Sequence, residues 1–232
     1  MANHVPFKAV FHIATPIILP FSTTLDGLLA AAINGFTGLT EGDDLFNEIP
    51  LALDAESRVF HGSTLFLGMR PRHVQVTKSR ALKSDDDLDA RHIAPKRKRN
   101  GELTNTPYPK MDKSRGDYAH KLSYYGAVEV PTVVAYGMGD IEAVRHCLEV
   151  IQGLGRHAQQ GCGEIRRIDI DEIDADLSLV SEQGNPQRPL PMPLWERLAS
   201  GGDYLPGTVA VRPPYWQEPL ETCALPLSQE LV

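Results

Sequence analysis

Apolar and polar positions alternate near the start of the chain. The apolar positions of residues 7–15 fall on one face of an extended backbone: Phe7, Ala9, Phe11 and Ile13. A period of two residues is typical of a strand with one buried face. Residues 7–15 are therefore predicted to form a half-buried strand, which the proline-containing stretch 16–21 interrupts.

The pattern then changes to the period of a helix. The apolar positions recur every three or four residues: Leu25, Leu28, Leu29, Ala32 and Ile33. Asp26 falls in the first turn of this helix, where a carboxylate favours the positive end of the helix dipole. The pair Asn34-Gly35 predicts the end of the helix.

Further along, residues 36–53 carry loop signals, and residues 58–69 are strand-like with a split at Gly62-Ser63. Residues 128–136 return to strand character. An apolar stripe between 141 and 154, with Asp140 as N-cap, predicts a second helix, and residues 165–170 alternate again as a strand. The order approximates β-α-β-β-α-β and predicts an α+β, ferredoxin-like core of the kind used by RNA-recognition domains.

Two segments fall outside this core pattern. Residues 70–125 lack a sustained period and are predicted to form a large basic insertion within a domain spanning 1–176. Residues 177–232 are rich in proline and are predicted to form an extended C-terminal extension packed on the core, with one short helix near 193–200.

The charge of the chain is strongly divided. The net charge is −7, but residues 70–125 carry 14 Lys and Arg against seven Asp and Glu, so the remainder carries −14. A basic segment on an acidic body is typical of a protein that meets a polyanion through that segment. Four of the seven tyrosines lie in the same segment, and cations interleaved with aromatic rings suit single-stranded nucleic acid.

We therefore take the basic and aromatic residues of this segment as candidate RNA ligands. They are Lys96, Arg97, Lys98, Arg99, Lys110, Lys113, Arg115, Tyr118, Lys121, Tyr124 and Tyr125. A solvated loop without a ligand is the alternative interpretation of the same charge run.

A glycine-rich stretch, GLGRHAQQGCG at 153–163, lies between the second helix and the last strand. A dinucleotide-binding loop needs a strand before it and a helix after it, and a P-loop needs a following Gly-Lys-Ser/Thr. Neither cofactor site fits, and no other cofactor is indicated. Its glycines and donors suit close approach to RNA, and the candidates are Gly153, Gly155, Arg156, His157, Gln159, Gln160, Gly161 and Gly163. A tight turn that only ends the helix is the alternative.

Several of these pieces together resemble the RAMP superfamily of CRISPR proteins. The TPIILP break, the TLDGLLA helix, SYYG followed by VEVP, YGMGDIEAV, the glycine-rich loop and VAVRPPYW are similar to the type IV CRISPR effector subunit of the Cas-five group. The resemblance covers roughly residues 5–40 and 120–216.

This resemblance implies a structural subunit that binds and caps the 5′ handle of CRISPR RNA. It also implies as partners a backbone RAMP subunit, a large subunit, target DNA reached through the assembled complex, and an accessory helicase. The basic insertion would be the thumb-like element of the family. Residues 70–120 match nothing that can be aligned, so their candidate ligands depend on charge and aromatic content alone.

Two other functions stay open from the sequence. Related RAMP proteins include metal-independent endoribonucleases, and His12, His61 and His157 are eligible acids or bases. No spacing unites them, so we expect a non-catalytic protein. A ferredoxin-like interaction module without nucleic-acid function is the third hypothesis.

The remaining features concern metals and cell compartment. No Cys-x-x-Cys pair or EF-hand loop predicts a metal site, and three widely spaced cysteines do not suggest disulfides. We therefore expect a cytoplasmic protein, and no signal peptide or membrane-spanning run is evident.

Overall fold

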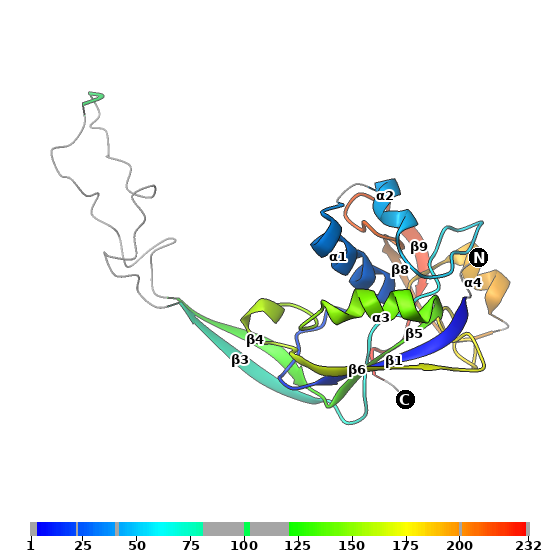
Figure 1. The fold of residues 1–232 in the computed structure, drawn as a ribbon, viewed down its shortest axis with the longest axis horizontal. Coiled ribbons are helices and arrows are strands. Elements are labelled where there is room, and N and C mark those ends of the chain that lie inside the picture. Colours follow the sequence, from blue (N-terminus) through cyan, green and yellow to red (C-terminus); the bar gives the residue numbers. More distant parts are fainter. Residues whose placement is uncertain are drawn as a thin grey trace. The chain divides into compact units, whose positions relative to one another are not determined.

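The computed structural model describes residues 4–21, 23–39, 42–80, 100–102, 121–199 and 201–230. The chain divides into two compact units, one formed by residues 75–126 and one by the rest of the chain. Figure 1 shows the helices and strands in chain order. The division into residues 1–176 and 177–232 stays a prediction.

A four-stranded sheet forms the base of the larger unit. Its order is β2-β5-β1-β6, and each neighbouring pair is antiparallel. The strands are β1 (Val5–Ile13), β2 (Phe66–Leu67), β5 (Thr132–Gly139) and β6 (Ile165–Glu172). Phe11 lies opposite Val133 on one side and Ile168 on the other, so the alternating apolar residues of β1 share one face with their neighbours.

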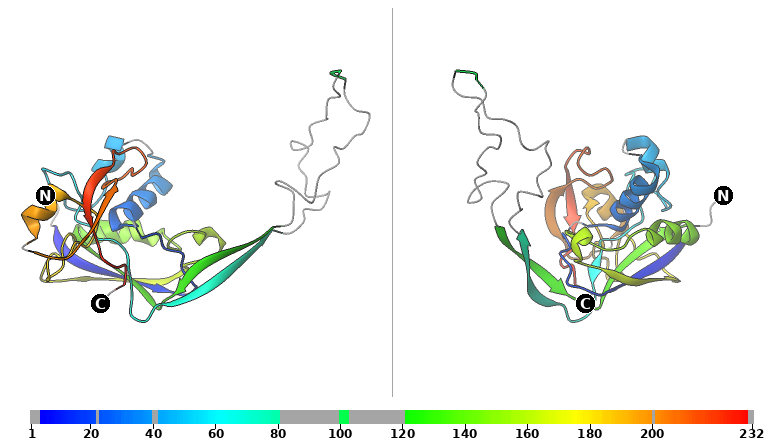
Figure 2. Two further views of the ribbon diagram at one scale, coloured as in Figure 1. Left: turned by 180° about the vertical axis from the view of Figure 1, so that it is seen from behind. Right: turned by 60° about the vertical axis from the view of Figure 1, so that its left-hand side comes forward.

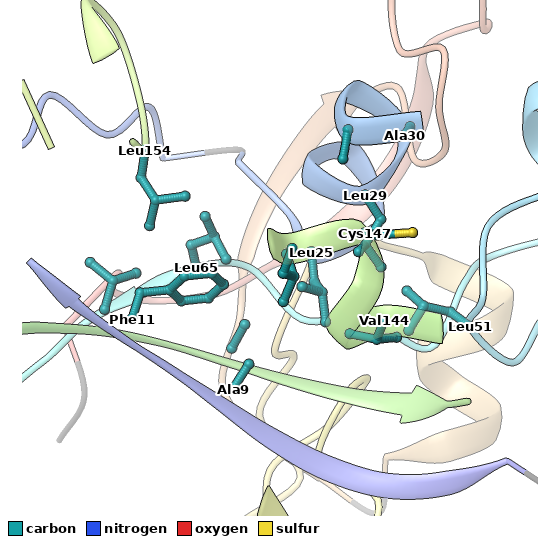
Figure 3. Packing of buried hydrophobic residues seen from close by; sticks show 14 of the residues in the cluster. Ala9, Phe11, Leu25, Leu29, Ala30, Leu51, Leu65, Val144, Cys147 and Leu154 are labelled. Carbon is teal, nitrogen blue, oxygen red and sulfur yellow. The ribbon is translucent and has the colours of Figure 1, made fainter. Parts of the chain in front are cut away.

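Two helices cover that apolar face (Figure 1). They are α1 (Leu25–Thr37) and α3 (Ile141–Glu149). Phe11 of β1 and Leu25 of α1 are fully buried, and Leu148 of α3 is 1% exposed. Figure 3 shows these strands and helices contributing side chains to one cluster. The structure thus confirms a mixed fold of helices and antiparallel sheet.

The C-terminal part builds a second, smaller sheet with the order β7-β9-β8. Its elements are β7 (Leu190–Pro191), α4 (Met192–Leu198), β8 (Leu205–Val209) and β9 (Glu221–Leu225). They lie beside one another in both views of Figure 2 and enclose their own apolar cluster. The extension is therefore more regular than predicted, although the short helix near 193–200 is confirmed.

Three of the remaining elements were not indicated by the sequence. The ends of the predicted insertion form paired strands, β3 (Arg72–Arg80) and β4 (Lys121–Glu129). The short helix α2 (Gly42–Asn47) occupies part of the stretch expected to be a loop. Of the strand-like stretch 58–69, only β2 forms a strand, and the rest makes isolated bridges.

The C-terminal ends of helices α1 and α3 both differ from the prediction. Helix α1 passes through Asn34-Gly35 and ends at Gly38, which has φ +73° and donates its N–H to the Asn34 carbonyl. A left-handed glycine is a frequent helix stop, and Gly38 rather than Gly35 adopts that conformation. Helix α3 ends at Glu149, yet Leu154 continues the apolar stripe from a loop and is 1% exposed.

A buried ion pair joins the first helix to the C-terminal part. Asp26 and Arg188 are both fully buried, with 3.2 Å between Asp26 Oδ2 and Arg188 Nη2. Arg188 also donates to the carbonyls of Phe60, Gly62 and Val211. Asp26 therefore does more than favour the helix dipole: it compensates a buried cation.

The Tyr215 hydroxyl completes this buried cluster. It donates to Asp26 at 2.9 and 3.0 Å, and its oxygen lies 2.6 Å from Thr24 Oγ1. Burial and the neighbouring Asp26 carboxylate raise the pKa of Tyr215 well above its ordinary value. Tyr215 therefore stays a neutral hydrogen-bond donor across the physiological pH range.

A second carboxylate makes stability depend on acid pH. Asp176 accepts from His61 Nδ1 at 2.7 Å and from the Ser178 N–H at 2.9 Å. Burial would raise the pKa of Asp176, but the hydrogen bonds from His61 and Ser178 outweigh it and lower that pKa below its ordinary value. A carboxyl with a lower pKa in the fold contributes stability above its unfolded pKa of about 3.9.

This contribution should be lost as pH falls through the folded pKa of Asp176. We expect the melting temperature to fall more between pH 7 and pH 3 in the wild type than in Asp176→Asn, because the amide cannot be protonated in that range. Thermal melts of both proteins at several pH values test this. Parallel curves would exclude Asp176 as a source of acid sensitivity.

Candidate nucleic-acid interface

The glycine-rich loop after α3 is fastened to the turn that follows β1. The Gly163 N–H donates to the Pro16 carbonyl at 3.0 Å, and the Arg156 N–H donates to the Ile18 carbonyl at 2.8 Å. Within the loop, the Leu154 N–H donates to the Gly163 carbonyl at 2.9 Å. Because these bonds fix both ends of the loop, its intervening residues 157–161 are held in one arrangement.

Three of the four candidate glycines have a backbone that favours glycine. Gly155, Gly161 and Gly163 have φ values of +81°, +87° and +63°. A Cβ at Gly155 would lie 2.4 Å from the Ile18 carbonyl oxygen, and one at Gly163 would lie 2.2 Å from that of Leu154. Gly155 and Gly163 thus permit close backbone packing, whereas a Cβ at Gly161 would meet nothing within 4 Å.

The predicted polar ligands lie on the outer side of this loop. Arg156, Gln159 and Gln160 are exposed, and the last two belong to the single 3-10 turn η4 (Ala158–Gln160). His157 precedes that turn with φ +61° and is half-buried. The structure therefore brings a guanidinium and two amides together on one solvent-facing loop. These groups can donate hydrogen bonds to the phosphates and base edges of a nucleic acid.

A cavity of about 650 Å³ adjoins the loop, and we call it the α3–β6 recess. Its boundaries are the C-terminal half of α3, the glycine-rich loop and the first part of β6. Ala158 and Gly161 line it from the loop. Three arginines also line it: Arg145, Arg166 and Arg167.

Sequence reasoning missed these arginines as site residues. Arg166 and Arg167 fell within the predicted strand 165–170, and Arg145 was not singled out at all. The register at the start of β6 shifts between His12 and Ile13, where Arg167 pairs with His12 but Ile165 pairs with Ile13. Such an irregularity changes the direction of the side chains around it. The sequence signal that could have identified this site was the pair of consecutive arginines soon after the glycine-rich loop.

The ribbon of β3 and β4 carries the described part of the predicted basic segment. Lys121 is exposed, Tyr124 is 57% exposed and Tyr125 is half-buried. Other candidates fall outside the described residues: Lys96, Arg97, Lys98, Arg99, Lys110, Lys113, Arg115 and Tyr118.

The candidate catalytic histidines each have a local role. His12 Nε2 donates to Asp169 at 2.7 Å, with Arg167 Nη2 3.3 Å away. His61 is bonded to Asp176 as described above, and His157 belongs to the glycine-rich loop. The histidines thus sit on three separate elements, and two of them are already engaged with carboxylates.

No group of three or more His, Cys, Asp or Glu side chains is placed to hold a metal ion in the part of the chain that is described. Among the same residues, no helix has the length and apolar character needed to cross a membrane.

Comparison with known proteins gives one decisive match. The family model described as CRISPR type IV associated protein Csf3 matches residues 5–225. No curated protein matches. One solved structure with a similar chain is "Cryo-EM structure of the Type III-B Cmr-beta bound to cognate target RNA", at 9% identity and a TM-score of 0.40.

That structural similarity covers 73% of this chain and 61% of the other, so this chain spans about three fifths of the neighbour's length. The family match, by contrast, includes both helices over the main sheet, the glycine-rich loop and most of the C-terminal part. It confirms the type IV resemblance inferred from the motifs: the chain belongs to the Csf3 family of type IV CRISPR-associated proteins.

Proposed function

We propose that this protein is a non-catalytic, RNA-binding structural subunit of a type IV CRISPR effector complex and that it binds the 5′ handle of CRISPR RNA. The observation that carries the proposal is the fastened glycine-rich loop. It exposes Arg156, Gln159 and Gln160 beside a recess lined by arginines. In a body whose charge is otherwise acidic, this grouping gives a polyanion a local point of attachment.

The strand order supports the finer fold assignment within this proposal. Along the chain, the core elements follow the order β1, α1, β2, β5, α3, β6, and both helices lie on one face of the sheet. This order and the sheet order β2-β5-β1-β6 agree with a ferredoxin-like core. The ribbon of β3 and β4 then corresponds to the base of a thumb-like insertion. Tyr124 on that ribbon offers an exposed ring for base stacking.

The proposed partners follow from the same assignment. The subunit would contact a backbone RAMP subunit and a large subunit, and would meet target DNA only through the assembled complex, to which an accessory helicase is added. Its place of action would be the cytoplasm. The RNA contact is the part that the purified chain can report directly.

Arg156→Ala should weaken binding of a labelled CRISPR repeat RNA by about 3- to 10-fold. It should also reduce the salt dependence of binding by about one counterion, because one phosphate contact is lost. Filter binding at several salt concentrations measures both. Arg197→Ala is the matched control, since Arg197 lies on α4 and pairs with Asp54 and Glu56.

The same incubation in EDTA, resolved on a denaturing gel, tests the non-catalytic part. We expect intact RNA. Products ending in 2′,3′-cyclic phosphate would instead identify an endoribonuclease and make His12, His61 and His157 the residues to replace. Equal RNA affinity of Arg156→Ala and the control would contradict the role of the loop.

A further inference from the structure

Part of the lining of the α3–β6 recess is apolar. Leu148 and Ile151 border it from the α3 side, and Ile165 and Ile168 border it from β6. These side chains belong to or pack against the main core, so their positions are fixed by the fold. A volume of about 650 Å³ lies within the roughly 300–1,000 Å³ range of small-molecule sites. These side chains offer apolar surface to a ligand that enters the recess.

Its polar lining includes acids as well as arginines. Glu149, Gln152 and Glu164 line the recess and are exposed. Carboxylates repel a phosphate, so these residues oppose entry of the RNA backbone. They can, however, accept hydrogen bonds from the exocyclic amino group of a base. The arginines that also line the recess can pair with phosphates outside it.

We propose that the α3–β6 recess binds one unstacked nucleobase that bears an exocyclic amino group: cytosine, adenine or guanine. Glu149, Glu164 and Gln152 would read its edge, the isoleucine walls would hold its faces, and Arg145 and Arg166 would hold the flanking phosphates. This reading of an extruded base between apolar side chains is a general mode of recognition. The inference rests on the proposed RNA-binding function.

The glycine-rich loop explains how a base could enter. Gly161 and Ala158 form the loop's side of the recess. A Cβ at Gly161 would meet nothing within 4 Å, so no packing requirement explains a glycine there other than its backbone conformation. Both residues are small, and the exposed neighbours Arg156, Gln159 and Gln160 would hold the adjoining nucleotides.

The test is a base-removal scan of the repeat RNA with the full-length protein. A set of RNAs, each with one abasic nucleotide, is measured for affinity. We expect one position at which base removal weakens binding at least 10-fold. Uracil, which has no exocyclic amino group, should weaken binding by a similar factor when it replaces the base at that position.

The variant Glu149→Gln/Glu164→Gln then locates the contact. Glutamine can also donate a hydrogen bond, so discrimination against uracil at that one position should fall to about 2-fold or less, while the salt dependence stays unchanged. Glu172→Gln is the matched control, because Glu172 is an exposed carboxylate on the same strand that does not line the recess. Equal melting temperatures for all three proteins confirm that they fold.

The outcomes separate this inference from the function on which it rests. Absence of RNA binding would overturn the proposed function and this inference with it. Binding without any position sensitive to base removal would overturn this inference alone. Unchanged discrimination in Glu149→Gln/Glu164→Gln would also overturn it, because the base would then be read elsewhere.

Discussion

Asp26→Asn should destabilise the protein by about 3–5 kcal/mol, because it leaves the Arg188 guanidinium buried without a counter-charge. Both side chains are fully buried, and the carboxylate also accepts from the Tyr215 hydroxyl. An asparagine amide keeps the shape but supplies no charge. Burial alone would lower the pKa of Arg188, but the Asp26 carboxylate raises it, so the charged guanidinium is favoured beside its partner.

Urea denaturation at pH 7 measures the loss of unfolding free energy. The matched control is Asp169→Asn, since Asp169 pairs with His12 at 2.7 Å and with Arg167 at 3.0 Å but its side chain is 42% exposed. An exposed pair contributes about 1 kcal/mol or less. Asp26→Leu/Arg188→Met should be more stable than Asp26→Asn, because both buried charges are removed together. Equal stability of Asp26→Asn and Asp169→Asn would contradict the role assigned to the pair.

Gly163→Ala should cost about 3 kcal/mol or more, from left-handed strain and steric overlap together. The added Cβ would lie 2.2 Å from the Leu154 carbonyl oxygen. Leu154 cannot easily move away, because its N–H donates to the Gly163 carbonyl across the loop. Gly161→Ala meets no atom within 4 Å and has φ +87°, so only backbone strain of about 1–2 kcal/mol applies.

Thermal melts of the two alanine variants compare these costs directly. Gly161→Ala should fold and should bind repeat RNA more weakly only if its methyl group hinders the ligand. Gly163→Ala should melt at a much lower temperature or be recovered as insoluble protein. Equal melting temperatures would show that the loop yields at Gly163, and that its fastening to Pro16 is not rigid.

Elements with a strong local period were predictable from the sequence. The alternation from Phe7 to Ile13 identified β1, because one of its faces is buried under two helices while the other is not. Asp140 identified the start of α3, where its side chain accepts from the N–H groups of Glu142 and Ala143. In these places the local signal and the tertiary packing agree.

Other elements depend on partners distant in sequence. Arg188 lies 162 positions from Asp26, and nothing near either residue distinguishes a buried pair from two surface charges. The strand β2 has only two residues, so its pairing with Val133 and Val134 decides its conformation rather than any pattern of its own. The break between β4 and β5 falls at Val130 and Pro131, inside a run that resembled one strand.

The candidate site was predictable in its loop but not in its surroundings. Glycines spaced through 153–163 mark a backbone that needs positive φ, which is a local property of the sequence. The arginines of the α3–β6 recess come from a helix and a strand whose proximity is set by the core. Arg145 and Arg166 could be grouped only once α3 was known to pack beside β6 on the main sheet.

The buried pair also constrains when the protein can fold during its own synthesis. Arg188 lies 162 positions after Asp26, and Tyr215 lies 189 positions after it, so both are synthesised long after the first helix. Until then the first helix carries a carboxylate whose burial would be unfavourable. The main sheet is therefore expected to close only after Arg188 and Tyr215 have been synthesised, which extends the period in which unfinished protein exposes apolar surface to chaperones.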